Sequence, residues 1–356
     1  MVSIAPTNLL KRITREAERA QIRARNSLKH FGGFASGKIA ASPRTAVWQR
    51  DSVVLYRYDS DRRTHGTPLI LVMSLVTKPY IFDLRPGSSL VEDLLNQSFD
   101  VYLLDWGTPQ PVDAHNGLET YCDEYIPRAV EAVRKTSGAS EVSLLGYCLG
   151  ALLSLIAVAG NPGLPVRNLM LLATPIDLSK MGPIASLVEA GRLEPSNLFD
   201  ETGNVPASVI RESFRLIQPT APLATYANLW QCLGNDEALA AHNALIGWSN
   251  DHIPFPGRVF EQMADAVIRQ RLLLTGRFPL ALRTVDLSAI DCPVLSVVGA
   301  RDSLVPPAAT EPLLGLLRNA DLESLVLPAG HAGLFVGRQA RTMCVPSIVD
   351  WLTEHN

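Results

Sequence analysis

The chain has 356 residues, 47% hydrophobic and 19% charged, a balance typical of a globular protein with a large core. Its formal net charge of −3 argues against a dedicated nucleic-acid binder. The sequence begins without a signal-peptide pattern and contains no apolar stretch long enough to cross a bilayer, so we expect no transmembrane segment.

The cysteines are widely scattered and show neither paired metal-ligand spacing nor a disulfide framework. They are Cys122, Cys148, Cys232, Cys292 and Cys344. Free thiols suit a reducing compartment, so we expect a cytoplasmic protein that holds no metal. His252 could bind a metal only with partner ligands, and no suitable spacing is evident.

The first 44 residues are expected to form an N-terminal helical segment. Apolar positions alternate with many basic side chains over residues 6–31, a pattern that predicts an amphipathic helix. Such a helix either packs on the domain surface or docks a partner or a granule surface.

Apolar strands and helices then alternate along the chain, which predicts an α/β fold with a mostly parallel sheet and right-handed crossovers. The predicted strands are 52–58, 67–73, 99–105, 141–145, 166–173, 292–299 and 322–327, with a helix over 117–135. Over residues 177–285 the alternation of strands and helices stops, and the sequence shows mainly helical patterns with many prolines. We therefore expect a core formed by 45–176 and 286–356, with 177–285 inserted as a helical cap. The strand near 294 should rejoin the sheet beside the strand ending near 173.

A nucleophile elbow is predicted where the strand 141–145 meets the helix that follows. The sequence Gly-Tyr-Cys-Leu-Gly at 146–150 has the Gly-x-nucleophile-x-Gly form, with Cys148 where hydrolases usually carry serine. The glycines leave room where the strand and helix cross, and the N–H of Leu149 at the helix N-terminus can face a reacting carbonyl. The other interpretation is a buried structural cysteine beside an ordinary strand–helix turn.

Two later residues supply a base and an orienting acid for this cysteine. Asp302 follows the strand 292–299, and His331 follows the strand 322–327, so both lie at carboxyl ends of predicted strands. Taken singly, His331 could be structural and Asp302 a turn residue. The order nucleophile, acid, histidine is that of the α/β-hydrolase triad, which predicts that Cys148, Asp302 and His331 act together.

The loop after the strand 67–73 is expected to complete an oxyanion hole. The backbone N–H of Leu75 or Val76 is the candidate donor beside that of Leu149. A plain strand-to-helix connection is the other interpretation of this loop.

Several longer motifs occur in one order along nearly the whole chain. They lie at 71–84 (LVMSLVTKPYIFDL), 101–107 (VYLLDWG), 146–150, 172–177 (LATPID), 248–257 (WSNDHIPFPG), 302–307 (DSLVPP) and 330–337 (GHAGLFVG). On these motifs the chain resembles polyhydroxyalkanoate synthases of the α/β-hydrolase superfamily, especially the short catalytic subunits of two-subunit enzymes. It departs from the family pattern at Ala151, at Ser303 and at residues 72–74.

The resemblance implies an acyltransferase that polymerises (R)-3-hydroxyacyl-CoA into polyhydroxyalkanoate and releases CoA. It implies a nucleophilic role for Cys148, a base role for His331 and an assisting role for Asp302. Trp248, in the inserted segment, is expected to pack in the cap or contact substrate. No cofactor is expected, since CoA is part of the substrate. The expected partners are the acyl-CoA, the growing polyester, a companion synthase subunit and further copies of the chain, in the cytoplasm or on a polyester granule.

Two rival functions remain open at this point. A hydrolase with a cysteine nucleophile, such as a thioesterase, an esterase or an intracellular polyester depolymerase, would use the same residues with water as the acceptor. A catalytically inactive granule or scaffold subunit is the non-enzymatic alternative, with Ala151 and Ser303 as its signs.

Overall fold

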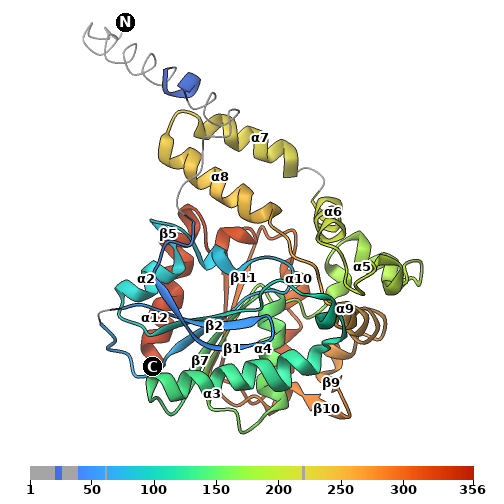
Figure 1. Ribbon diagram of the computed structural model, residues 1–356. Helices are drawn as coiled ribbons and strands as arrows, with labels where there is room; N and C mark the ends of the chain where they lie inside the picture. The colour runs from blue at the N-terminus through green and yellow to red at the C-terminus, as the bar shows by residue number, and fades with distance from the viewer. Residues whose placement is uncertain (1–20, 26–38, 61, 219–220) are drawn as a thin grey trace, which may run out of the picture.

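The computed structural model describes residues 21–25, 39–60, 62–218 and 221–356 (Figure 1). The amphipathic helix predicted over 6–31 lies mostly outside the described residues; within them, residues 21–25 are helical. No helix of the described ranges combines the length and the apolar character needed to cross a membrane.

The core is an eight-stranded sheet in the order β1-β2-β6-β3-β7-β8-β11-β12. Its strands are β1 (Arg44–Arg50), β2 (Val53–Tyr58), β3 (Leu69–Val72), β6 (Val101–Asp105), β7 (Val142–Tyr147), β8 (Val166–Leu172), β11 (Val294–Gly299) and β12 (Leu322–Leu327). The strands from β6 to β12 run parallel, whereas β1 and β2 are antiparallel to their neighbours. This mostly parallel sheet flanked by helices confirms the predicted fold class.

Helices cover both faces of the sheet, so the central strands are buried on both sides. All residues of β3, β7 and β11 are buried. Adjacent residues Leu144 and Leu145 of β7 belong to different hydrophobic clusters, as expected when alternate side chains point to opposite faces. One cluster includes α3 (Ile126–Ser137) and α4 (Leu149–Gly160), and the other includes α2 (Leu90–Asn96) and α12 (Val345–Glu354).

The segment 177–285 lies between β8 and β11, which are neighbours in the sheet. Its elements are α5 (Pro183–Glu189), α6 (Ala207–Ile217), α7 (Ala221–Cys232), α8 (Asp236–Asn250), α9 (Gly257–Gln262), and the hairpin β9 (Arg277–Leu280) and β10 (Arg283–Asp286). Helices α6, α7 and α8 extend beyond one edge of the sheet (Figure 1). The later part returns to the core, where Phe278 and Val285 of the hairpin join the cluster around α4. As predicted, β11 then pairs with β8, with Val294 opposite Leu169.

Three strand features were not predicted from the sequence, one of them the short antiparallel pair β4 (Asp83–Arg85) and β5 (Ser88–Ser89). Strand β1 was not predicted, because it is a sheet-edge strand in which no residue is fully buried and apolar alternation is weak. The hairpin β9–β10 lies in a region expected to be mainly helical. Its strands are four residues each, too short for a clear period in the sequence.

Candidate active site

Cys148 lies in a strained turn between β7 and α4. Its backbone has φ 54° and ψ −123°, which is rare for a residue with a side chain and costs about 1–3 kcal/mol. The turn is held because the N–H of Cys148 donates to Leu172 O at 2.8 Å, and the carbonyl of Cys148 accepts from Ala151 N at 3.0 Å. The side chain therefore leaves the sheet at its carboxyl edge, at the N-terminus of a buried helix, where partial positive charge favours a developing oxyanion.

The two glycines of the elbow are required by close packing. A Cβ on Gly150 would lie 2.3 Å from Val72 O and 2.5 Å from Met73 O. A Cβ on Gly146 would lie 2.4 Å from Ala151 Cα. The start of α4 thus touches the end of β3, which places the elbow beside the loop 73–79 that follows β3 (the β3 loop).

The structure brings Cys148, Asp302 and His331 together. His331 Nδ1 lies 2.7 Å from Asp302 Oδ2, and both side chains are almost fully shielded from solvent. The other carboxylate oxygen, Oδ1, accepts from the N–H groups of Leu304 at 2.9 Å and Val305 at 2.8 Å. A carboxylate fixed this way holds Nδ1–H of His331, which leaves Nε2 for the thiol of Cys148.

The electrostatics of His331 reflect two opposing effects. Burial lowers its pKa, but the charges of Asp302 and Cys148 and the hydrogen bonds with both side chains raise the pKa overall, to about 10. An imidazole of this kind readily holds a proton taken from the sulfur of Cys148.

The β3 loop is fixed from both sides. The indole of Trp106 donates to Met73 O at 2.8 Å. From the inserted segment, Trp248 Nε1 donates to Lys78 O at 2.8 Å, and Ile253 N donates to Val76 O at 3.2 Å. The loop conformation therefore depends on the inserted segment as well as on the sheet.

The two candidate oxyanion donors of this loop differ in position. Val76 lines the pocket at Cys148, whereas Leu75 is buried and is not among the lining residues. Within the described chain, neither N–H donates to a backbone carbonyl. The N–H of Leu149, at the first position of α4, is likewise unpaired there.

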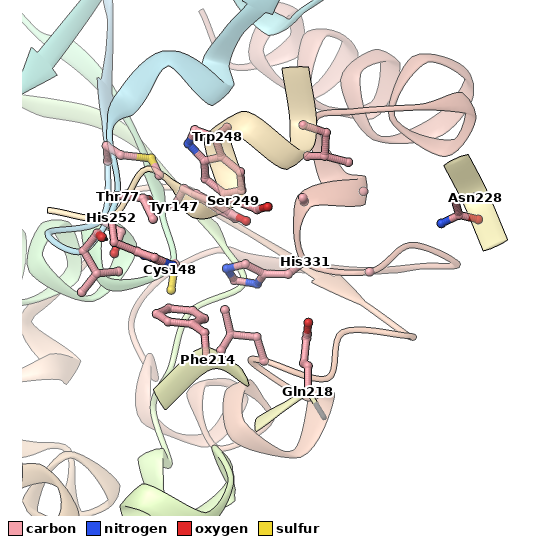
Figure 2. Close-up of a pocket in the computed structure, with 18 residues that line it drawn as sticks. Thr77, Tyr147, Cys148, Phe214, Gln218, Asn228, Trp248, Ser249, His252 and His331 are labelled. Carbon is pink, nitrogen blue, oxygen red and sulfur yellow. Dashed lines mark hydrogen bonds between the residues drawn. The ribbon is translucent and has the colours of Figure 1, made fainter. Parts of the chain in front are cut away.

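A pocket of about 470 Å³ opens onto the sulfur of Cys148 (Figure 2). Its lining is mainly apolar and comes from the β3 loop, the elbow, the loop 330–333 and helices α6, α7 and α8. Trp248 is 6% exposed, packs in the hydrophobic core and also lines this pocket. Its contact with substrate stays a prediction.

Several lining residues were not identified from the sequence. The ring of Tyr147 lies 4.7 Å from that of His331, and Phe214 and Gln218 reach the pocket from α6 and its C-terminus. Gln218 also donates to Ser303 Oγ at 2.7 Å, which links α6 to the residue after Asp302. No motif marks such contacts, because they depend on how distant elements pack.

The other cysteines lie outside this pocket. Burial raises the pKa of the Cys344 thiol to about 12 and that of Cys292 to about 11, and it raises the pKa of Cys122 well above the ordinary value. Burial also raises the pKa of Cys232. These thiols are poor nucleophiles compared with one beside an imidazole. No cluster of metal-ligating side chains occurs among the described residues.

The sheet order, the strained elbow and the acid–histidine pair define a protein of the α/β-hydrolase fold with cysteine at the nucleophile position. The family model for the alpha/beta hydrolase fold matches residues 68–204. Relatives in other organisms identify the family more closely. The chain is 33% identical over 317 residues to the poly(3-hydroxyalkanoate) polymerase subunit PhaC of Allochromatium vinosum, covering 88% of this chain and 89% of the relative.

The chain therefore belongs to the family of poly(3-hydroxyalkanoate) polymerase subunits PhaC, enzymes of the acyltransferase type. The PhaC subunit of Haloferax mediterranei is 32% identical over 321 residues, and the match covers 89% of this chain but 65% of that longer protein. The PhaC subunit of Synechocystis is 29% identical over 325 residues, covering 89% of this chain and 86% of the relative.

Solved structures share the fold at low sequence identity. An esterase from Rhodococcus, RhEst1, superposes with a TM-score of 0.53 at 18% identity, covering 88% of this chain and 99% of that one. A thermophilic esterase from Thermogutta terrifontis gives a TM-score of 0.53 at 16% identity, covering 88% of this chain and 100% of that one. These similarities support the fold alone.

We expect Gly150→Ala to lower the free energy of unfolding by about 1–3 kcal/mol, because the added methyl group meets the carbonyls of Val72 and Met73. The matched control is Gly247→Ala in α8, where a Cβ meets nothing within 4 Å. That change should raise stability by about 0.5–1 kcal/mol through helix propensity. Urea unfolding of both variants measures the difference, and equal effects would contradict the close approach at the elbow.

The ion pair between His331 and Asp302 predicts a pH-dependent stability. Because the folded-state pKa of His331 is about 10, above the unfolded value of 6.5, the folded protein binds the proton more tightly between these pH values. The stabilisation is complete below pH 6.5 and is lost as the pH rises towards 10. Asp302→Asn keeps an oxygen for the amides of Leu304 and Val305 but removes the charge.

We therefore expect wild type and Asp302→Asn to differ most in unfolding free energy near pH 6 and to converge as the pH approaches 10. Urea unfolding at several pH values tests this expectation. A stability difference that does not change with pH would show that the carboxylate does not charge His331.

Proposed function

We propose that this protein polymerises (R)-3-hydroxyacyl-CoA into a polyhydroxyalkanoate and releases CoA, with Cys148 as the nucleophile. The observation that carries the proposal is that Cys148 and His331 line a mainly apolar pocket, with Asp302 bonded to His331 behind it. Membership of the PhaC family supports the substrate class, since its relatives are named poly(3-hydroxyalkanoate) polymerase subunits.

In the first step, Cys148 becomes acylated. The proton of the thiol passes to Nε2 of His331, and the sulfur attacks the thioester carbonyl. The N–H of Leu149, with that of Val76 or Leu75, stabilises the oxyanion. Collapse of the tetrahedral intermediate breaks the bond to the CoA sulfur, which takes the proton from His331 and leaves as the thiol.

In the second step, the acyl group passes to a hydroxyl. The 3-hydroxyl of a second acyl unit or of a chain end gives its proton to Nε2 of His331 and attacks the acyl-thioester on Cys148. The cysteine sulfur is expelled and takes back the proton from His331. One ester bond forms for each thioester consumed, and Asp302 orients and charges the imidazole in both steps.

Exclusion of water is what separates polymerisation from hydrolysis, because an acyl-thioester that meets water gives a free acid. Residues 177–285 act in this proposal as the cap over the active site. Phe214 of α6 and Leu245 and Trp248 of α8 line the pocket together with Cys148. Trp248 would also contact the acyl chain.

The proposal includes partners and a location. The relatives are named as subunits, which supports a companion synthase subunit for this chain as well. We further propose that the chain self-associates, works without a cofactor, and acts in the cytoplasm on the surface of the polyester that it makes.

We expect Cys148→Ala to abolish both CoA release from 3-hydroxybutyryl-CoA and the acyl adduct on the protein, because Sγ is the attacking atom. Cys292→Ala, at a partly buried thiol outside the pocket, is the matched control and should leave both intact. The measurements are thiol titration of CoA and mass spectrometry of the intact and digested protein.

The same incubation distinguishes the rival functions. Polymer formed with CoA release supports the synthase, free 3-hydroxybutyrate with CoA release supports a hydrolase, and neither product supports an inactive scaffold. An adduct on Cys122 or Cys292 in place of Cys148 would refute the nucleophile assignment.

A further inference from the structure

A second imidazole faces the active-site pocket. His252 follows α8 in the loop after Asn250 and lines the same pocket as Cys148 and His331. Figure 2 shows Cys148, His331 and His252 together in this pocket. The catalytic steps described above use His331 and leave His252 without a role.

The ring of His252 is held in a defined orientation. It stacks on Phe214 with the ring centroids 4.9 Å apart and the planes 26° from parallel. Its Nδ1 lies 3.2 Å from Val76 O, and the backbone of His252 forms an antiparallel bridge with Thr77. The imidazole is thus anchored both to the inserted segment and to the β3 loop.

These contacts determine which nitrogen of His252 carries the hydrogen. A carbonyl oxygen can only accept a hydrogen bond, so Nδ1 must donate to Val76 O. Burial lowers the pKa of His252, which favours the neutral ring at neutral pH. In this tautomer Nε2 has a lone pair and no hydrogen, and it has no hydrogen-bond partner among the described residues. His252 therefore offers the pocket a fixed acceptor.

An acyl group bound to Cys148 would need such an acceptor if it carries a hydroxyl. The 3-hydroxyl lies two carbons beyond the thioester carbonyl, inside a mainly apolar pocket, where an unpaired hydroxyl costs free energy. Nδ1 of His331 is paired with Asp302, and in the mechanism above its Nε2 takes the proton of the attacking hydroxyl from the second acyl unit or chain end. Gln218 and Ser249 also line the pocket, where they donate to Ser303 Oγ and Ile246 O, respectively, and each keeps an oxygen that can accept. His252 differs from them because its ring is held by both Phe214 and Val76 O, so its acceptor has one defined position.

We propose that Nε2 of His252 accepts a hydrogen bond from the 3-hydroxyl of the acyl group on Cys148, and so selects 3-hydroxyacyl over unsubstituted acyl substrates. This inference rests on the proposed function. It makes His252 a specificity-determining residue, because an acyl group without the hydroxyl leaves the acceptor unpaired in the pocket.

The test compares acylation of Cys148 by 3-hydroxybutyryl-CoA and by butyryl-CoA in single-turnover CoA release, with the adduct followed by mass spectrometry. Two variants test the roles of the two ring nitrogens separately. His252→Asn keeps a donor near the position of Nδ1 for Val76 O but lacks an atom at Nε2. His252→Gln can place its amide oxygen near Nε2.

Wild type should prefer the hydroxylated substrate. His252→Asn should lower the ratio of the acylation rate with 3-hydroxybutyryl-CoA to that with butyryl-CoA by about 10- to 100-fold, the range expected when a buried hydrogen bond is lost. The change should come from slower acylation by 3-hydroxybutyryl-CoA. His252→Gln should restore part of the ratio. Urea unfolding checks both variants, and His252→Phe, which keeps a ring to stack on Phe214, replaces His252→Asn if that variant does not fold.

The other outcomes overturn the inference in distinguishable ways. A ratio unchanged in His252→Asn, with the Cys148 adduct still formed, refutes the role of His252 and leaves the proposed function standing. An equal loss on both substrates shows that His252 acts only by positioning the β3 loop, which also refutes it. Absence of a Cys148 adduct from either substrate in wild type overturns the proposed function and this inference together.

Discussion

The active site depends on one close approach, between the first turn of α4 and the carboxyl end of β3. At Gly150 there is no room for even a methyl group against the carbonyls of Val72 and Met73. This contact forces the strained conformation of Cys148, since the chain must turn within one residue from a buried strand into a buried helix. It also sets the N-terminus of α4 beside the β3 loop, so the nucleophile and both candidate oxyanion donors share one small region.

The active site also depends on contacts between the inserted segment and the β3 loop. The end of α8 and the loop that follows it donate three hydrogen bonds to carbonyls of the β3 loop, from Trp248, His252 and Ile253. Asp251 adds an ion pair with Lys78 at 3.2 Å. The inserted segment, which lines the pocket, therefore also fixes the backbone of the loop that carries two candidate oxyanion donors. A change in these contacts is therefore expected to alter the conformation of the β3 loop as well as the shape of the pocket.

Much of this arrangement could be predicted from the sequence, because its signals are local. Continuous apolar runs indicate strands buried on both faces, and the glycine spacing at 146–150 requires a tight strand–helix turn. Strand order and chain order then place Asp302 and His331 at the same edge of the sheet. Contacts that arise from tertiary packing have no such local signal. Phe214 reaches the pocket because of the orientation of α6, and it stacks on His252. The partner of His252 Nδ1 is a backbone carbonyl, which every residue has, so the sequence does not indicate this contact.

The pairing of Asp302 with His331 follows from the register of two neighbouring strands. β11 and β12 are parallel, with Gly299 opposite Leu327, so the loops that leave them start side by side. Gly299 permits their contact, because a Cβ there would lie 2.6 Å from Ala329 O. Burying Asp302 is costly, and the N–H groups of Leu304 and Val305 offset that cost without an added cation. The interaction with Asp302 raises the pKa of His331 against the effect of burial, which makes the imidazole a strong proton acceptor beside the sulfur of Cys148.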